Sequence, residues 1–137
     1  MSSKTASSTV IVLVEDDDVD ALLFERTLAG CDGSYELHVH CTLESAMQWI
    51  EQHHCDVVLL DYSLPDSFGL DGLRRLQSRF ARLPVVMLTG LDDPQAAIDA
   101  HDHGATDYLV KGIVPSSELD QTLQRAARGA RLAVADK

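Results

Sequence analysis

The sequence predicts an α/β fold in which helices wind around both faces of a parallel sheet of five strands. Short runs of consecutive apolar residues, typical of strands buried on both faces, alternate with segments whose apolar residues recur at helical spacing. No Asn-Gly or similar hairpin turn joins these runs, so we expect right-handed crossovers through the helices. The length of 137 residues fits one domain with one core.

The first half of the chain contains three predicted strands and two predicted helices. The strands cover residues 10–14, 35–39 and 57–61, and the weakly alternating middle one is expected at a sheet edge. The helices follow from apolar residues three or four positions apart, which are Ala21, Phe24 and Leu28, and then Leu43, Ala46, Met47 and Ile50. We expect Asp17 or Asp18 to be the N-cap of the first helix and Gly30 to end it. Thr42 is the expected N-cap of the second helix.

The second half repeats this alternation, with strands predicted at residues 84–89 and 107–111. Three apolar stripes predict its helices: Leu70, Leu73, Leu76 and Phe80; Ala96, Ala97, Ile98 and Ala100; Leu119, Leu123, Ala126 and Ala130. Asp93 and Pro94 are expected to open the middle helix and Gly104 to close it, and Ser116 or Ser117 is expected to cap the last. We therefore expect a disordered tail at 1–9, the domain at 10–134 and a short tail at 135–137.

Composition excludes several classes of protein. The chain has 22 acidic and 11 basic residues, a formal net charge of −11, and no basic run that would neutralise successive phosphates, which argues against direct nucleic-acid binding. No apolar run approaches the roughly 20 residues of a membrane span and no signal-peptide core is visible, so we expect a cytoplasmic protein with no membrane partner. Cys31, Cys41 and Cys55 match no zinc or disulfide spacing and are predicted to be reduced, mostly packed thiols.

Acidic residues stand where the predicted first and third strands end. The strand order 2-1-3-4-5, that of a flavodoxin-like three-layer sandwich, places these two strands side by side at the topological switch point. Glu15 and Asp16 then face Asp61 across one strand spacing of about 5 Å. Three carboxylates at such short distances repel one another and favour the binding of a hard cation with oxygen ligands. Mg²⁺ is the expected cation.

Two further strand ends point into the same acidic crevice. Thr89 ends the fourth predicted strand and Lys111 ends the fifth. A hydroxyl and an ammonium beside a carboxylate nucleophile are the groups needed to stabilise a phosphoryl group on it. Taken alone, Thr89 is an ordinary strand-end hydroxyl and Lys111 a solvated surface charge, so the prediction depends on the whole set.

With these residues, the chain resembles the receiver domain of bacterial two-component response regulators, similar to the chemotaxis regulators, from Val10 to Val134. The resemblance implies that Asp61 is the phosphoacceptor, that Glu15 and Asp16 bind Mg²⁺ and that the backbone carbonyl of Ser63 completes the metal site. It further implies that Thr89 and Lys111 contact the phosphoryl group, and that Thr89 and Tyr108 form the switch. One departure is Gly112, which stands where the family usually has proline.

The function implied by this resemblance is a signalling switch and not a turnover enzyme: the domain assists only its own phosphorylation and dephosphorylation. A histidine kinase or histidine phosphotransfer protein would donate the phosphoryl group. The face formed by the helix from Pro94, the strand at 107–111 and the last helix would then change and be read by an output domain or protein. The sequence names neither the kinase nor the output partner, and leaves open whether phosphorylation drives formation of a homodimer.

Other functions fit the sequence less well. A Mg²⁺-dependent phosphatase with an aspartyl nucleophile resembles a pattern with a second acid two residues later, where this chain has Ser63. An FMN-binding protein needs a phosphate loop after the first strand, where residues 15–18 would repel phosphate. A scaffold that keeps the fold without phosphorylation remains open. The histidine pairs His38 and His40, His53 and His54, and His101 and His103 lack the spacing of a helical metal site.

Overall fold

The sheet of this domain has the predicted topology. The computed structural model describes residues 8–90, 94–112 and 114–135, without the side chains of 130–135. Its five parallel strands are, in spatial order, β2 (Tyr35–His40), β1 (Thr9–Val14), β3 (Val57–Asp61), β6 (Val85–Thr89) and β7 (Asp107–Val110). This order is the expected 2-1-3-4-5, because two additional short strands, β4 (Ser63–Leu64) and β5 (Ser67–Phe68), lie outside the sheet.

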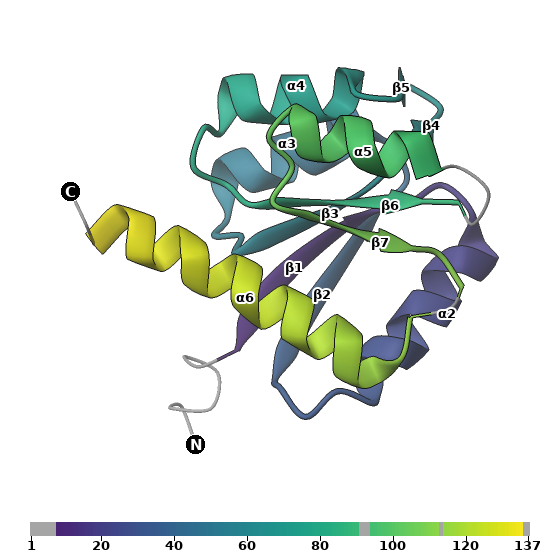
Figure 1. The fold of residues 1–137 in the computed structure, drawn as a ribbon, viewed down its shortest axis with the longest axis vertical. Coiled ribbons are helices and arrows are strands. Elements are labelled where there is room, and N and C mark those ends of the chain that lie inside the picture. The colour runs from purple at the N-terminus through teal and green to yellow at the C-terminus, as the bar shows by residue number, and fades with distance from the viewer. Residues whose placement is uncertain (1–7, 91–93, 113, 136–137) are drawn as a thin grey trace.

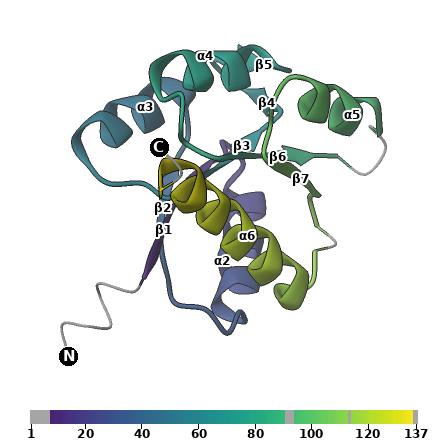
Figure 2. The ribbon, with the colours of Figure 1, turned by 60° about the vertical axis from the view of Figure 1, so that its left-hand side comes forward.

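Helices cover both faces of the sheet, so the molecule has three layers (Figures 1 and 2). One face carries α2 (Asp18–Ala29) and α6 (Ser116–Ala135), and the other carries α3 (Leu43–Gln52), α4 (Asp71–Arg79) and α5 (Pro94–Asp102). Successive strand residues point to opposite faces, so Ile11 packs with α2 and α6 whereas Val12 packs with α3 and α4. The sheet thus packs against one hydrophobic core on each face, and the carboxyl edge of the sheet is free to form a site.

Most helix ends are those predicted. The Asp17 carboxylate accepts hydrogen bonds from the backbone N–H groups of Val19 and Asp20, and Gly30 is the C-cap of α2. The Thr42 hydroxyl accepts from the backbone of Ser45 and caps α3. Ser116, one of the two predicted caps of α6, is instead its first helical residue, and its hydroxyl donates to the carbonyl of Thr27, which ties α6 to α2. The Asp93 cap and the Ala130 side chain lie outside the described residues.

Several details differ from the sequence predictions. Thr9, assigned to the tail, is the first residue of β1 because its N–H donates to Ser34. A hairpin of β4 (Ser63–Leu64) and β5 (Ser67–Phe68) follows β3 and was not predicted. Ile98, expected as an anchor of α5, is 54% exposed, so α5 is held by alanines. All three cysteines are free thiols, but Cys41 is exposed.

Candidate functional site

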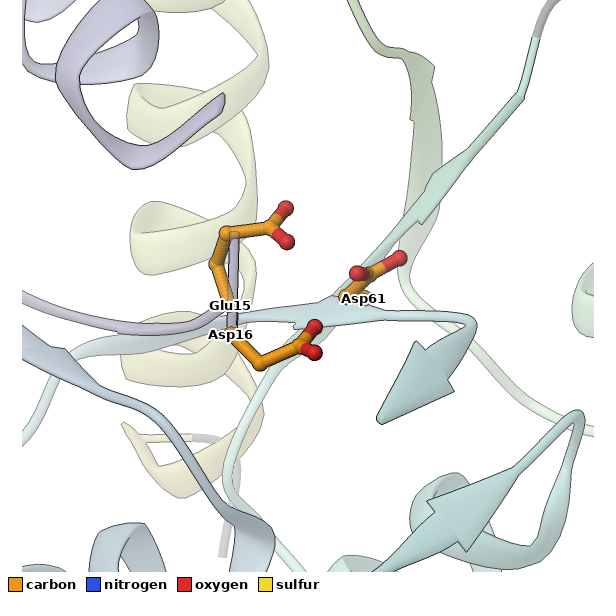
Figure 3. Close-up of side chains that lie close together, drawn as sticks. All are labelled: Glu15, Asp16 and Asp61. Atoms are coloured by element: carbon orange, nitrogen blue, oxygen red, sulfur yellow. The ribbon is translucent and has the colours of Figure 1, made fainter. Parts of the chain in front are cut away.

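Three carboxylates converge at the carboxyl edge of the sheet. Because β1 and β3 pair in register, with Val14 opposite Leu60, the acids that follow Val14 lie beside Asp61 at the end of β3. One carboxylate oxygen each from Glu15, Asp16 and Asp61 lies within 4.8 Å of the others. Figure 3 shows the three carboxylates turned toward one shared space. The predicted acidic crevice is confirmed.

The three acids differ in their exposure to solvent. Glu15 and Asp61 are only 3% and 6% exposed, whereas Asp16 is exposed. Burial raises the pKa of Glu15 to about 7; the hydrogen bond from Lys111 opposes this rise and the nearby Asp61 adds to it. The second Glu15 oxygen accepts from the backbone N–H of Asp17 at 3.2 Å, so the helix start helps to hold this side chain.

Lys111 is the cation of the site. Its Nζ lies 2.9 Å from Glu15 Oε1, 3.0 Å from Asp20 Oδ2 and 3.2 Å from Asp61 Oδ2. Burial alone lowers the pKa of Lys111, but the hydrogen bonds to Glu15 and Asp20 and the charge of Asp61 raise it above its usual value. The ammonium therefore stays charged and already contacts the predicted phosphoacceptor.

The backbone on both sides of Lys111 fixes its position. Its N–H donates to the carbonyl of Thr89 at 2.9 Å, which extends the pairing of β7 with β6 by one residue. The next residue, Gly112, has φ of +86°, in the left-handed region that glycine tolerates. Proline cannot adopt this angle, because its ring holds φ near −65°. Gly112 thus gives this loop a conformation that the family's usual proline cannot have.

Sequence reasoning missed the contribution of Asp20. Acids in the first turn of a helix commonly stabilise the helix dipole, so an aspartate at this position gives no sign by itself of a role in the site. The available signal was its place in the first turn of a helix that begins at the sheet edge, directly after Glu15 and Asp16. Its carboxylate is the second closest of the three that contact the Lys111 ammonium.

The predicted switch residues lie on the neighbouring strands. Thr89, at the end of β6, is 1% exposed, and its hydroxyl donates to the carbonyl of Leu109 at 3.5 Å rather than to Asp61. Tyr108, on β7, is 44% exposed. Both line one surface groove with Ala97 and Ile98 of α5. Thr89, Tyr108 and α5 therefore border the same groove, and the Thr89 hydroxyl forms no hydrogen bond with the three acids.

The loop after Asp61 is anchored at several points. Tyr62 donates its N–H to Leu88 and accepts from Gly69, and the Ser63 N–H lies 3.4 Å from Asp61 Oδ1. The Asp66 carboxylate accepts from the backbone N–H groups of Leu43 and Glu44, at 2.9 Å each, and so caps α3 from the distant loop. Hydrogen bonds to β6, within the loop itself and to the start of α3 thus hold the segment that carries Ser63.

The chemistry of the acidic cluster fits a hard divalent cation. All its side-chain donors are carboxylate oxygens, the ligands that Mg²⁺ favours, and no softer nitrogen or sulfur donor takes part. Lys111 contacts Glu15 and Asp61, whereas no cation among the described residues forms an ion pair with Asp16. The arrangement defines a class of domain: a parallel-sheet domain whose open edge combines a cation-binding cluster with an acid held against a lysine.

Known proteins share this fold and sequence. The family model of the response regulator receiver domain matches residues 11–124. The transcriptional regulatory protein BasR of Escherichia coli is 40% identical over 101 residues, covering 74% of this chain and 45% of BasR. The regulatory protein AtoC of the same organism is 30% identical over 122 residues, covering 89% of this chain and 26% of AtoC. The chain thus spans less than half the length of these curated relatives.

Solved structures agree. NtrX from Brucella abortus superposes with a TM-score of 0.81 at 26% identity, over 94% of this chain and 29% of that one. A receiver domain protein from Clostridium thermocellum gives 0.78 over 91% of this chain and 98% of that one, and at 24% identity it supports the fold. The chain belongs to the response regulator receiver domain family of two-component signalling. Such a domain is a signalling element and not a classical enzyme.

Proposed function

We propose that this domain is a phosphorylation-dependent switch in which Asp61 accepts a phosphoryl group from a phosphohistidine. The observation that carries the proposal is the position of Asp61: it is buried at a strand end, within 4.8 Å of two other acids and 3.2 Å from Lys111. A buried carboxylate so surrounded would be costly in a merely structural role. It is suited to chemistry in which negative charge accumulates on one oxygen and must be neutralised.

In the transfer step, an Asp61 carboxylate oxygen forms a bond to phosphorus while the bond from phosphorus to the donor imidazole nitrogen breaks. The electron pair of that bond leaves with the imidazole. Lys111 neutralises charge on the transferred group, and the Thr89 hydroxyl, which binds Leu109 before transfer, turns to donate to it. Hydrolysis of the acyl phosphate resets the domain, so the chain assists only these two reactions.

A bound Mg²⁺ would neutralise negative charge on the carboxylates and on the phosphoryl oxygens. The side chains of Glu15, Asp16 and Asp61 would hold it, together with the backbone carbonyl of Ser63. The anchored loop after Asp61 supports the role of Ser63, because the hairpin and the Asp66 cap restrict the positions of this backbone.

The conformational response would pass through the groove between α5 and β7. Movement of the Thr89 hydroxyl toward the phosphoryl group frees space near Tyr108, whose ring lies at the surface. Helix α5 buries only alanines among its described core residues, so shifting it costs less than shifting a leucine-rich helix. A local hydrogen bond would thereby change the face formed by α5, β7 and α6.

The proposed partners follow from the chemistry and the surface. The donor is a histidine kinase or a histidine phosphotransfer protein. This domain offers the donor an accessible apolar surface beside the acids, because Val19, Leu22 and Leu23 of α2 are 65%, 45% and 47% exposed. The partner that recognises the changed surface is an output domain or protein. BasR, whose name is that of a transcriptional regulator, extends well beyond the matched region.

No described helix is long and apolar enough to cross a membrane. We place the switch in the cytoplasm.

Intact-mass measurement after incubation with acetyl phosphate tests this function. With Mg²⁺ present, the wild-type protein should gain the mass of one phosphoryl group, and a chelator of divalent cations should prevent the gain. Asp61→Asn should gain nothing. Asp71→Asn, which makes the same charge change at an exposed position at the start of α4, should behave like wild type. Equal phosphorylation of the Asp61→Asn protein would show that the assignment is wrong.

The conformational part of the proposal has its own test. Amide chemical shifts recorded with and without beryllofluoride, which mimics a phosphoryl group, should change in α5 and β7 as well as near Asp61. Changes confined to the loop after Asp61 would show that this receiver signals through another surface. The transfer step and the surface response are measured in separate experiments. A negative result for one of them therefore does not prevent a test of the other.

A further inference from the structure

A fourth carboxylate belongs to this site and has no assigned role. Asp20 Oδ2 contacts the Lys111 ammonium at 3.0 Å, closer than Asp61 Oδ2 at 3.2 Å. An ammonium has three N–H donors, and here it has three carboxylate contacts, with Glu15 as the third. Any new contact of Lys111, including one to a phosphoryl group, therefore has to weaken one of these three.

The three contacts are not equally replaceable. Glu15 and Asp61 have side chains only 2% and 7% exposed, so loss of the cation would leave each of them without a counter-ion in a desolvated position. The Asp20 side chain is 39% exposed, and water can take the place of the ammonium there. The contact to Asp20 is consequently the one that Lys111 can release at least cost.

We propose that Asp20 is a positioning residue that holds Lys111 in the unphosphorylated arrangement and competes with the phosphoryl group for it. The inference rests on the proposed function of Asp61. In the unphosphorylated state the contact to Asp20 is made; in the phosphorylated state Lys111 serves the new anion and the contact weakens. An interaction present in one state and weakened in the other biases the equilibrium toward the first.

The sign of the effect follows from charge as well as from geometry. A phosphoryl group adds negative charge at Asp61, and the Asp20 oxygen shares the nitrogen atom that must neutralise that charge. Removal of the Asp20 charge leaves the ammonium freer and lessens the repulsion of an incoming anion. The phosphorylated state should therefore gain stability when Asp20 becomes neutral.

Asp18 offers a matched control on the same helix. It lies two residues earlier in the first turn of α2 and is exposed, and its side chain forms no ion pair or hydrogen bond within the described parts of the chain. Asp18→Asn and Asp20→Asn change the net charge of the protein equally. A difference between them measures the contact to Lys111 and not the general acidity of this region. Asp17 is unsuitable, because its carboxylate caps α2.

The test is a beryllofluoride titration at saturating Mg²⁺, followed by fluorine NMR or calorimetry, with melting curves to establish that each variant is folded. Asp20→Asn should bind beryllofluoride about two- to fivefold more tightly than wild type, the range expected for a partly exposed ion pair. Asp18→Asn should change the affinity by much less. Asp20→Glu, which keeps the charge on a longer side chain that still reaches Lys111, should stay near wild type.

The outcomes separate this inference from the function on which it rests. Equal affinities of Asp20→Asn and Asp18→Asn, or weaker binding by Asp20→Asn, would overturn the role of Asp20 and leave the phosphoacceptor intact. Tighter binding by Asp20→Glu than by wild type would also overturn it, because a retained charge should still compete. Failure of the wild-type protein to bind beryllofluoride, with Asp61→Asn behaving identically, would contradict the proposed function itself.

Discussion

Lys111 Nζ lies 2.9 Å from Glu15 Oε1 and thus contacts this acid of the cluster more closely than it contacts Asp61. The lysine is therefore a structural counter-ion for the acidic cluster before it takes part in any transfer. Without a metal, it is the only cation among residues 8–90, 94–112 and 114–129 that forms an ion pair with Glu15 or Asp61. We therefore expect stability, metal binding and phosphoryl transfer to be coupled through this one side chain.

Replacement of Lys111 should reveal this coupling. We expect Lys111→Met to lower the free energy of unfolding of the metal-free protein by about 1 to 3 kcal/mol, because it leaves buried carboxylates without their donor. Mg²⁺ should then stabilise this variant more than wild type. Denaturant unfolding with and without Mg²⁺ measures both effects. Arg125→Met is the control: Arg125 pairs with Asp107 but is 66% exposed, so its loss should cost less than about 1 kcal/mol.

The buried position of Glu15 predicts a pH dependence. Burial, the first cause, raises its pKa from 4.5 in the unfolded reference to about 7. Between these values the folded state binds more protons than the unfolded state, so the metal-free protein should lose stability as pH rises from about 4.5 to about 7. Glu15→Gln removes the titrating group and should show a flatter profile in this range. Melting curves at several pH values, recorded without metal, test this, and identical profiles would contradict it.

The sequence predicted the acidic crevice because its geometry follows from topology. Once the strand order is known, residues that end adjacent parallel strands must meet at one edge, as Glu15, Asp16 and Asp61 do. The contact of Asp20 with Lys111 does not follow from topology, because it depends on how α2 is rotated and on the side-chain conformation. The direction of the Thr89 hydroxyl toward Leu109 is likewise a choice between nearby acceptors that no sequence pattern specifies.

The loop after β3 likewise has features that no local sequence pattern specifies. The hairpin there comes from the pairing of two-residue strands, which are too short to give an alternating pattern. The cap that Asp66 places on α3 joins residues more than 20 positions apart. Local sequence signals identified Thr42 as the cap because it directly precedes the helix, and they contain no information about a second cap from elsewhere.

Stabilisation by Mg²⁺ should depend on Asp16. Mg²⁺ bound at the proposed site would relieve repulsion among three carboxylates that are close together only in the folded state, so it should raise the melting temperature. At ten times Kd the gain is about 1.4 kcal/mol. Asp16→Asn should show a much smaller response, whereas Asp18→Asn, with the same charge change, should respond like wild type. Asp61→Asn should itself raise the metal-free melting temperature. An undiminished response of Asp16→Asn would exclude this metal site.

The long-range cap predicts a role for Asp66 in stability. Partial burial raises its pKa, but the hydrogen bonds from the backbone N–H groups of Leu43 and Glu44 outweigh this and lower it overall. Asp66→Ala should cost about 1 kcal/mol, the usual value of an N-cap. Since the folded-state pKa lies below the unfolded value, this contribution is present above the unfolded pKa and is lost as pH falls through the folded one. Denaturant unfolding at neutral and acidic pH measures the cost, and a loss that persists unchanged in acid would contradict it.

The most direct test of the central claim is to locate the phosphorylated residue chemically. Borohydride reduces an aspartyl phosphate to homoserine, which survives proteolysis and is located by peptide mass spectrometry. After phosphorylation with acetyl phosphate and Mg²⁺, we predict homoserine at position 61 and no side chain reduced to an alcohol at any other acid, Glu15 and Asp16 included. Homoserine at another position, or phosphorylation of the protein with an unmodified Asp61, would contradict the account.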